Sequence, residues 1–214
     1  MTPDRFPPLE GIAGVCAAFL PRVPGIAVDA EREVVLGRLA SAHRIMADAA
    51  GFSGMPFASA EQVHGADLAV VNAPMPAVSP GVDGLLTSRP GIALAIYVAD
   101  CAAVFLADRH ARAIALVHSG KKGTQLGIAT RAVQELHQEF GVAPGDLVAV
   151  VSPCIRPPHY EVDFAADIRN QLREAGVTAV FDEGVCTAEN PRYYSYRREK
   201  GRTGRMLALL ALTR

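Results

Sequence analysis

The stretch IALAIYVADCAAVFLADRHARAIALVH, residues 92–118, decides the fold of this chain. It contains three apolar runs, over 92–98, 103–108 and 113–118, each bounded by Gly, Asp, Arg or His. Short and almost entirely apolar runs of this kind are typical of buried strands. Only five residues, Asp108-Arg109-His110-Ala111-Arg112, connect the second and third runs. This connection is short enough for a hairpin, so we expect those two strands to be antiparallel.

Similar runs and helical patterns extend outward from this stretch. Further strands are predicted over 66–71, 84–87, 147–151, 177–181 and 205–212. Apolar residues at helical spacing predict helices over 31–50, 125–140 and 163–175. Asp29 and Asp163 are the expected N-caps of the first and third helices, and Gly141 is expected to end the second. The pattern favours a single α/β domain over residues 1–214 with a mixed sheet.

Composition narrows the classes of function. The chain has 214 residues, half of them apolar, with 21 Lys and Arg against 22 Asp and Glu, a net charge of −1. Without a polybasic run, nucleic acid is not an expected partner. No apolar window reaches the roughly 18 residues of a membrane span, and MTPDRFPPLE does not resemble a secretory signal, so we expect a cytoplasmic protein. Six His and four Cys without a C-x-x-C pair allow about one metal site.

Three metal-competent residues lie at the ends of apolar runs. His64 lies in AEQVHGAD, Cys101 in YVADCAAV and His118 in ALVHSGKKG. Strand ends that lead into glycine-containing loops are where α/β proteins assemble their sites. Two imidazoles, a thiolate and a water form the open zinc site used in catalysis, and copper fits the same ligands. The spacing is not a local ligand motif, so structural histidines and a buried thiol are the alternative.

A candidate anion site follows His118. Residues 119–124, SGKKGT, are expected to form a loop that leads into a helix. The backbone N–H groups of Gly120 and Gly123, with the side chains of Lys121 and Lys122, suit a phosphate. The motif is not a nucleotide-binding GxxxxGK[ST] loop, and a solvated turn with two surface lysines is the alternative.

Two carboxylates and one basic segment complete the candidate residues. Asp83 and Asp100 precede Gly84 and Cys101, where each carboxylate is expected to orient a ligand, to carry a proton or to cap a turn. The segment PRYYSYRREKGRTGR, 191–205, combines tyrosines with five arginines, Arg197 among them. It is expected to stack a base, to fix a phosphate or to clamp the edge of the sheet.

These residues lie in blocks that resemble the YfiH-like laccase-domain family, whose members are called polyphenol oxidase, purine nucleoside phosphorylase or peptidoglycan editing factor. The blocks are QVHG (62–65), DGLLT (83–87), ADC with VFLAD (99–108), HSGKKGT (118–124), HYEV (159–162) and YYSYRREKGRTGRM (193–206). The resemblance implies that His64, Cys101 and His118 are the metal ligands. It also implies a layered α/β fold with mixed sheets flanked by helices, distantly similar to Cys-His deamidating toxins.

The resemblance also implies chemistry on purine nucleosides. The implied reactions are phosphorolysis of adenosine, inosine or methylthioadenosine, and deamination of adenosine. Where the family usually has HAGWRG this chain has HSGKKG, so Lys121 replaces a Trp and Lys122 replaces an Arg. Lysine keeps the positive charge but lacks the two-pronged guanidinium that binds phosphate bidentately.

Four functional hypotheses follow. The first is a zinc-dependent purine nucleoside enzyme in which Asp83 or Asp100 moves protons. The second is a metal-free hydrolase or amidase of peptidoglycan precursor editing, with Cys101 as nucleophile and His118 or His64 as base. The third, copper-dependent phenol oxidation, is disfavoured because a multicopper cluster needs more imidazoles than the chain has to spare. The fourth is a binding module without turnover. Nothing in the sequence specifies an oligomeric state.

Overall fold

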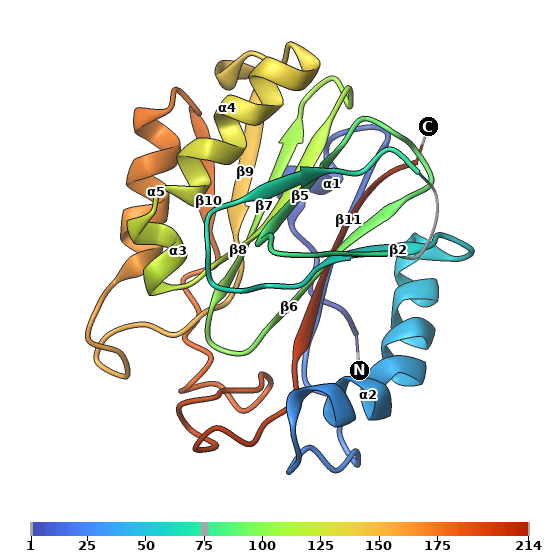
Figure 1. The fold of residues 1–214 in the computed structure, drawn as a ribbon, viewed down its shortest axis with the longest axis vertical. Coiled ribbons are helices and arrows are strands. Elements are labelled where there is room, and N and C mark those ends of the chain that lie inside the picture. The colour runs from blue at the N-terminus through green and yellow to red at the C-terminus, as the bar shows by residue number, and fades with distance from the viewer. Residues whose placement is uncertain (1, 74–76, 214) are drawn as a thin grey trace.

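The computed structural model describes residues 2–73 and 77–213, in which two mixed β-sheets pack face to face (Figure 1). The five-stranded sheet has the order β1-β11-β6-β2-β4, and the six-stranded sheet has the order β10-β9-β7-β8-β5-β3. The first consists of β1 (Val15–Leu20), β2 (Phe57–Ala60), β4 (Ala77–Ser79), β6 (Ala93–Val98) and β11 (Met206–Leu212). The second consists of β3 (Leu68–Val70), β5 (Gly84–Thr87), β7 (Ala102–Asp108), β8 (Ile114–Ser119), β9 (Leu147–Val151) and β10 (Ala179–Asp182).

The stretch 92–118 links the two sheets. It forms β6 in the five-stranded sheet, crosses at Cys101, and continues as β7 and β8 in the six-stranded sheet. The predicted hairpin is confirmed, since β7 and β8 pair antiparallel from Ala102↔Ser119 to Ala107↔Ile114. The expectation of one mixed sheet is wrong, because strands that are apolar on both faces do not indicate which sheet they join. The two mixed sheets that the resemblance implies are confirmed.

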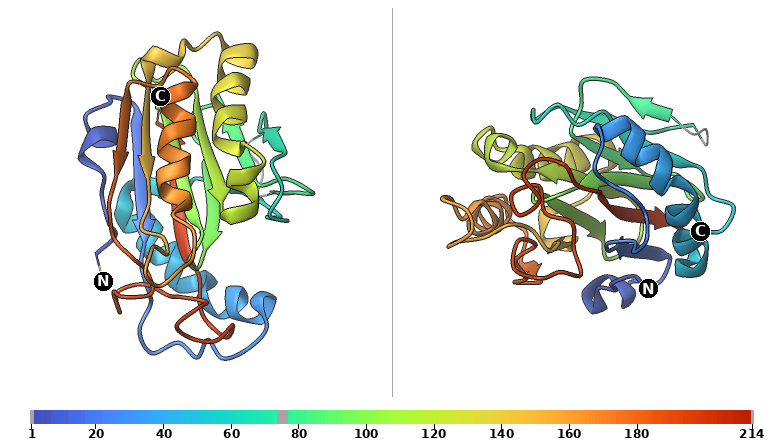
Figure 2. Two further views of the ribbon diagram at one scale, coloured as in Figure 1. Left: turned by 90° about the vertical axis from the view of Figure 1, so that its left-hand side faces the viewer. Right: turned by 90° about the horizontal axis from the view of Figure 1, so that it is seen from below.

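The sheets are the inner layers of a layered molecule. Their facing sides form a shared core, with Phe19 and Leu94 from one sheet and Phe105 and Leu116 from the other. Helices α4 (Ile128–Phe140) and α5 (Phe164–Glu174) cover the outer face of the six-stranded sheet. The end of α2 (Arg32–Ala47), with the π-helical turn Asp48–Phe52, covers the other outer face (Figures 1 and 2).

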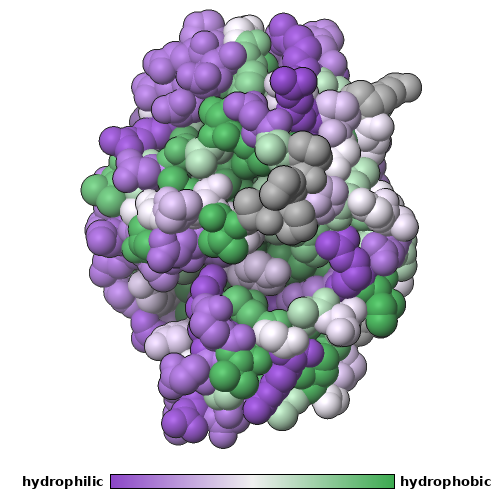
Figure 3. Space-filling model, turned by 45° about the vertical axis from the view of Figure 1, so that its right-hand side comes forward, coloured by the Kyte–Doolittle hydropathy of each residue, from purple (hydrophilic) through white to green (hydrophobic). Residues whose placement is uncertain are grey.

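Short elements and a mixed surface complete the fold. The short α1 (Pro7–Glu10) buries Leu9 in the shared core, and the 3₁₀ turn Pro144–Asp146 precedes β9. Figure 3 shows one face of the molecule, where hydrophobic residues form small patches between hydrophilic ones. Among the described residues, none of the helices has the length and apolar character needed to cross a membrane.

Several helix boundaries differ from those expected. Asp163 does cap α5, since its carboxylate accepts from the Ala166 amide at 3.0 Å, and Gly141 ends α4 with φ 66°. The expected cap at Asp29 is wrong, because α2 begins at Arg32 after Glu31. The expected loop over 119–124 is also wrong in part, because residues Lys121–Gln125 form the short helix α3. Gly127, with φ 76°, then separates α3 from α4.

Candidate metal centre and its cavity

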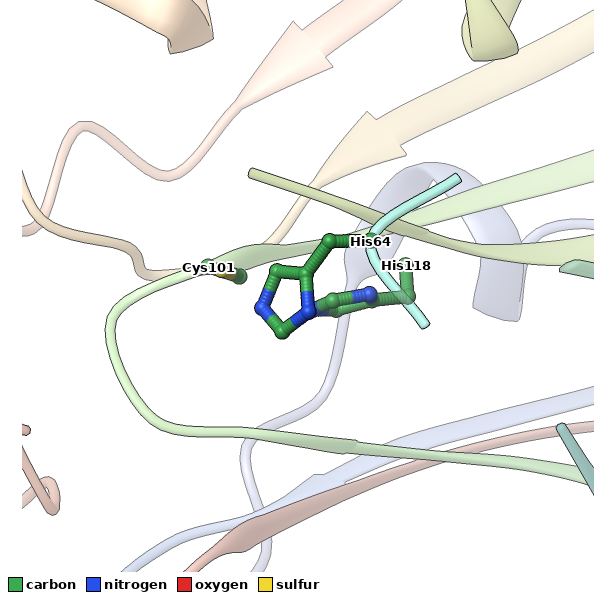
Figure 4. Close-up of side chains that lie close together, drawn as sticks. All are labelled: His64, Cys101 and His118. Carbon is green, nitrogen blue, oxygen red and sulfur yellow. The ribbon is translucent and has the colours of Figure 1, made fainter. Parts of the chain in front are cut away.

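The structure brings His64, Cys101 and His118 together from three separate segments. His64 lies on the loop after β2, Cys101 at the crossing from β6 to β7, and His118 in β8. Their potential ligand atoms all lie within 4.8 Å of one another. The two imidazole rings are 4.9 Å apart between centroids and nearly perpendicular, and Cys101 faces them (Figure 4). The three residues therefore form a possible metal site.

A buried carboxylate, Asp83, supports two of the three residues of the possible metal site. One of its oxygens, Oδ1, accepts a hydrogen bond from Nδ1 of His118 at 2.7 Å and from the amide of His64 at 2.9 Å. The other oxygen, Oδ2, accepts from the amides of Val63 and Gly65 at 3.1 and 2.7 Å. Burial raises the pKa of Asp83, but His118 and the loop amides outweigh it, so the pKa is lowered. Asp83 thereby directs Nε2 of His118 toward the possible metal site, as carboxylates behind metal-bound histidines do.

The thiol of Cys101 ionises at a lower pH than an ordinary cysteine. Burial raises its pKa, but the imidazoles of His118 and His64 stabilise the thiolate more strongly and lower the pKa to about 6. Burial lowers the pKa of His118, but Asp83 and Cys101 reverse this effect and raise it to about 9. A thiolate beside two imidazoles is a ligand set that suits zinc or copper. The residues present therefore fit a metal ion of this kind.

The loop that carries His64 has a strained backbone that side-chain contacts hold in place. Gln62 and His64 adopt φ of 66° and 61°, values that residues other than glycine rarely adopt. The Gln62 amide bonds the backbone of Tyr97 in β6, accepting from its N–H at 3.0 Å and donating to its carbonyl at 2.6 Å. Strain that the surrounding structure maintains is common at functional sites.

Asp100 connects the segments around Cys101. Its backbone also has a positive φ, 82°, and its side chain is buried. One carboxylate oxygen accepts from the Thr187 hydroxyl at 2.7 Å, and the other accepts from the Arg197 amide at 2.7 Å. Both oxygens are therefore occupied in positioning neighbouring segments, although Asp100 lines the cavity.

The 120–123 segment packs tightly against the possible metal ligands. A Cβ at Gly120 would lie 2.5 Å from the sulfur of Cys101, and one at Gly123 would lie 3.1 Å from the carbonyl oxygen of Gly65. Glycine at both positions allows α3 to approach the ligands this closely. Lys121 lines the adjacent cavity, whereas Lys122 is exposed and is not part of that lining.

The possible metal site opens into a cavity of about 570 Å³. This volume lies in the range of small-molecule sites, roughly 300–1,000 Å³. Aromatic rings and cationic side chains line much of the remaining wall: Tyr97, Tyr160, Phe164, Tyr196, Arg32, Lys121, Arg197 and Arg205. The cavity can therefore hold a flat apolar group beside an anionic one.

The 191–205 segment has a structural role and also contributes to the cavity wall, while its expected contact with a base or a phosphate stays a prediction. The Arg198 guanidinium donates to three backbone carbonyls in 187–190, which is a structural clamp. Tyr196, Arg197 and Arg205 from the same segment line the cavity. The guanidinium of Arg197 also lies 5.1 Å from the centre of the Tyr160 ring.

Several cavity residues were not predicted from the sequence. Gln62 lies in the QVHG block beside His64, a signal that could have identified it. Arg32 is the first residue of α2 and Tyr97 lies within β6, where the sequence pattern does not distinguish them from surface and core residues.

A second cluster does not resemble a metal site. Asp108, His110 and Asp146 also bring ligand atoms within 4.8 Å of one another. However, Arg112 pairs with the carboxylates of both Asp108 and Asp146, at 2.5 and 3.1 Å. The negative charge that a cation would need is therefore already balanced.

Comparison with known proteins places this site in context. The family model described as multi-copper polyphenol oxidoreductase laccase matches residues 29–167 and 161–213. A Deinococcus radiodurans protein named purine nucleoside phosphorylase is 36% identical over 195 residues, which cover 79% of this chain and 75% of that protein. The Geobacillus stearothermophilus protein named purine nucleoside phosphorylase YlmD is 31% identical over 191 residues, with 70% of each covered.

Solved structures give the same fold. The crystal structure of YlmD from Geobacillus stearothermophilus has a TM-score of 0.82 at 27% identity, with 98% of this chain and 94% of that chain covered. The Bacillus licheniformis protein YfiH has a TM-score of 0.78 at 24% identity, with 92% of each chain covered. The layered α/β architecture with two mixed sheets is thus a known fold.

Proposed function

The chain belongs to the multi-copper polyphenol oxidoreductase laccase family, and we propose that it is a metal-dependent enzyme acting on purine nucleosides. The observation that supports this most strongly is the convergence of His64, Cys101 and His118, backed by Asp83, at a cavity with aromatic walls. Relatives named purine nucleoside phosphorylase also match most of the chain.

His64, Cys101 and His118 would hold the metal ion, which we take to be zinc, with copper as the other ion that fits. When bound, the ion supplies a Lewis acid that polarises an oxygen of the substrate or of water. Asp83 keeps the proton of His118 on Nδ1, so that Nε2 is the ligand atom. Asp100, next to Cys101, holds the Thr187 and Arg197 segments in position through hydrogen bonds to its two carboxylate oxygens.

The walls of the cavity suit a purine nucleoside. The rings of Tyr160, Phe164 and Tyr196 offer faces on which a purine base would stack. The phosphate contact predicted from the sequence for Gly120, Lys121, Lys122, Gly123 and Arg197 stays a prediction. Lys121 and Arg197 are the two of these residues that line the cavity.

Two reactions on the same substrate are proposed. In phosphorolysis, a phosphate oxygen forms a bond to C1′ while the C1′–N9 bond breaks. The electron pair of the broken C1′–N9 bond goes to the purine, which also takes up a proton. The products are the free base and a pentose 1-phosphate. In deamination, a water oxygen replaces the C6 amino group of adenosine, which leaves as ammonia.

Elemental analysis combined with nucleoside chromatography tests the proposal. Metal-loaded protein would be incubated with adenosine, inosine and methylthioadenosine, each with and without phosphate. We expect a phosphate-dependent free base, or inosine from adenosine, and loss of both metal and turnover in Cys101→Ala. Cys16→Ala is the matched control, because that thiol lies away from the cavity. Metal-loaded protein that leaves all three nucleosides unchanged would refute the proposal.

A second candidate is supported by the acidity of Cys101. With a pKa of about 6, this thiol would be largely ionised at neutral pH and could act as a nucleophile without a metal, with His118 or His64 as base. A metal-free Cys-His hydrolase or amidase of peptidoglycan precursors would remain active after chelation. Zinc would inhibit it, which is the opposite of the first proposal.

Copper-dependent phenol oxidation finds less support in the donor set. The possible metal site has two imidazoles, and of the other four histidines only His110 belongs to a metal-competent cluster among the described residues. A multicopper centre needs more imidazoles close together. A binding module without turnover would bind nucleosides but form no product from them, which distinguishes it from the proposed enzymes.

A further inference from the structure

The cavity has two groups of cationic side chains with different charge environments. Lys121 and Arg197 both pair with the carboxylate of Glu161, at 3.4 and 3.3 Å. Arg32 and Arg205 form the second group. Within the described part of the chain, the one acidic partner of Arg32 is the adjacent Glu33, whose side chain is 81% exposed. Arg205 has no acidic partner within 4 Å among residues 2–73 and 77–213.

The position of Arg205 is fixed by the backbone around it. Its Nη1 donates to the carbonyls of Thr203 and Gly204 at 2.9 and 3.0 Å, and the Arg205 guanidinium makes no other hydrogen bond to the described residues. Gly204 packs against the Tyr194 ring so closely that a Cβ there would lie 2.3 Å from the ring. The Thr203 hydroxyl donates to Glu199 at 2.6 Å. The guanidinium is therefore fixed in position, and its remaining N–H groups can donate hydrogen bonds to a ligand.

The nearby carboxylates are already occupied. Glu199 also pairs with Arg22 and Arg198, and both oxygens of Asp100 accept hydrogen bonds from other groups. Burial and the like charge of Arg32 both lower the pKa of Arg205. A partly buried cation beside a second cation is unfavourable unless an anion joins them. The unpaired charge therefore indicates a binding site for an anion.

We infer that Arg205 and Arg32 form the subsite of the cavity that binds a phosphate group. Guanidinium groups bind phosphate oxygens bidentately and retain their charge at any physiological pH, which suits them to this role. Within the proposed function, on which this inference rests, the group would be the phosphate whose oxygen bonds to C1′ as the C1′–N9 bond breaks. Alternatively, it would be the phosphate of a nucleotide.

Titration calorimetry on metal-loaded protein tests the subsite without relying on turnover. Inorganic phosphate and adenosine 5′-monophosphate would be titrated separately at constant ionic strength set by chloride. Arg205→Gln is expected to weaken phosphate binding at least about tenfold, the effect of losing a charged hydrogen bond, and Arg32→Gln several-fold. Metal content and adenosine affinity should remain those of the unmodified protein. Arg38→Gln on the exposed face of α2 is the matched control.

The outcomes separate the alternatives. Binding of the monophosphate but not of inorganic phosphate, with the same Arg205 dependence, would support the subsite and assign its phosphate to the substrate. Loss of phosphate binding in Lys121→Gln, Lys122→Gln or Arg197→Gln but not in Arg205→Gln would overturn the inference. So would unmodified protein that binds neither ligand. If Arg205→Gln does not fold, Arg205→Lys and Arg32→Gln decide the question by the same titration.

Failure of this inference is distinguishable from failure of the proposed function. Absence of nucleoside turnover in metal-loaded protein would count against the proposed function alone. The phosphate titration and its dependence on Arg205 can still be measured in that case.

Discussion

Asp83 illustrates how one buried carboxylate can organise a site made of distant segments. It holds the proton of His118 and three consecutive amides of the loop that carries His64. An asparagine side chain at this position would carry no charge, and its NH₂ group would be a donor where Asp83 has an acceptor oxygen. The geometry of two of the three candidate ligands therefore depends on this one side chain.

Asp83→Asn is accordingly expected to weaken zinc binding by about 10- to 100-fold, the usual cost of removing a partner behind a metal-bound histidine. Competition with a chromophoric chelator measures the affinity. Asp67→Asn serves as control, because that carboxylate is exposed and pairs with Arg131. Equal zinc affinities in the two variants would contradict the role assigned to Asp83.

Cys101 should be distinguishable from the other thiols by its reactivity. In chelated protein, its alkylation rate by iodoacetamide should rise with a midpoint near pH 6, because the neighbouring imidazoles lower its pKa to about 6. Cys16 and Cys154 should react slowly, since burial raises the pKa of both, to about 12 for Cys154. Mass spectrometry of the labelled peptides gives each rate, and added zinc should protect Cys101. A midpoint near pH 9 for Cys101 would disprove the stabilised thiolate.

At the residue level, the three residues that converge at the possible metal site were easier to predict from the sequence than the cavity walls. His64, Cys101 and His118 are recognisable because each interrupts an apolar run with a polar, metal-competent side chain. The role inferred for Arg205 depends on its having no carboxylate partner in the described part of the chain. Nothing in a sequence reveals an absent contact.

At the level of elements, α3 shows why a glycine-rich segment after a strand need not be a loop. Its glycines allow the helix to pack against Cys101 and the His64 loop. The short helix was missed because glycine and lysine after a strand are typical of turns. The long apolar strands β6, β7, β8 and β11 were predicted. The short β2 and β4 and helix α1 were not, because their few residues give little periodicity, and the six-residue β1 was also missed.

Gly120→Ala tests this packing. The added Cβ would overlap the sulfur of Cys101, so we expect a loss of about 1–3 kcal/mol in the free energy of unfolding and a loss of bound zinc. Gly37→Ala in α2 is the matched control, because its Cβ would meet nothing within 4 Å. It should gain roughly 0.5–1 kcal/mol. Chemical denaturation measures both, and equal stability of the two variants would contradict the close approach of α3.

Helix α2 carries a buried histidine that should make stability depend on pH. Burial lowers the pKa of His43 to about 4, despite a backbone contact from Arg205, and its Nε2 has no partner among the described residues. The unfolded chain has a pKa of about 6.5 at this position. Between these values the unfolded chain binds more protons, so stability is fully present above about pH 6.5 and falls as the pH drops toward 4.

The expected loss from His43 is about 3 kcal/mol across this window. His43→Phe keeps an aromatic ring without a proton site, so its free energy of unfolding should fall less over the same pH range. Urea denaturation at several pH values compares the two proteins. Parallel pH profiles would show that His43 titrates alike in both states.

At the scale of the whole molecule, the candidate site lies where the two sheets meet. His64 follows a strand of the five-stranded sheet, His118 belongs to the six-stranded sheet, and Cys101 lies at the crossing between them. Arg32 and Arg205, far apart in the sequence, meet at the same cavity. Sequence patterns predict elements, but the packing of two sheets decides which loops converge.

A metal ion bound by these three residues would therefore link both sheets. An ion that binds only the folded chain stabilises it by about 4 kcal/mol when its free concentration is 1,000 times the dissociation constant. For a protein of this size, this corresponds to a rise of about 10 °C in melting temperature. Differential scanning calorimetry of zinc-loaded and chelated protein should show that difference, and Cys101→Ala should show almost none. If chelation left the melting temperature of the unmodified protein unchanged, zinc would not be holding the sheets together through this site.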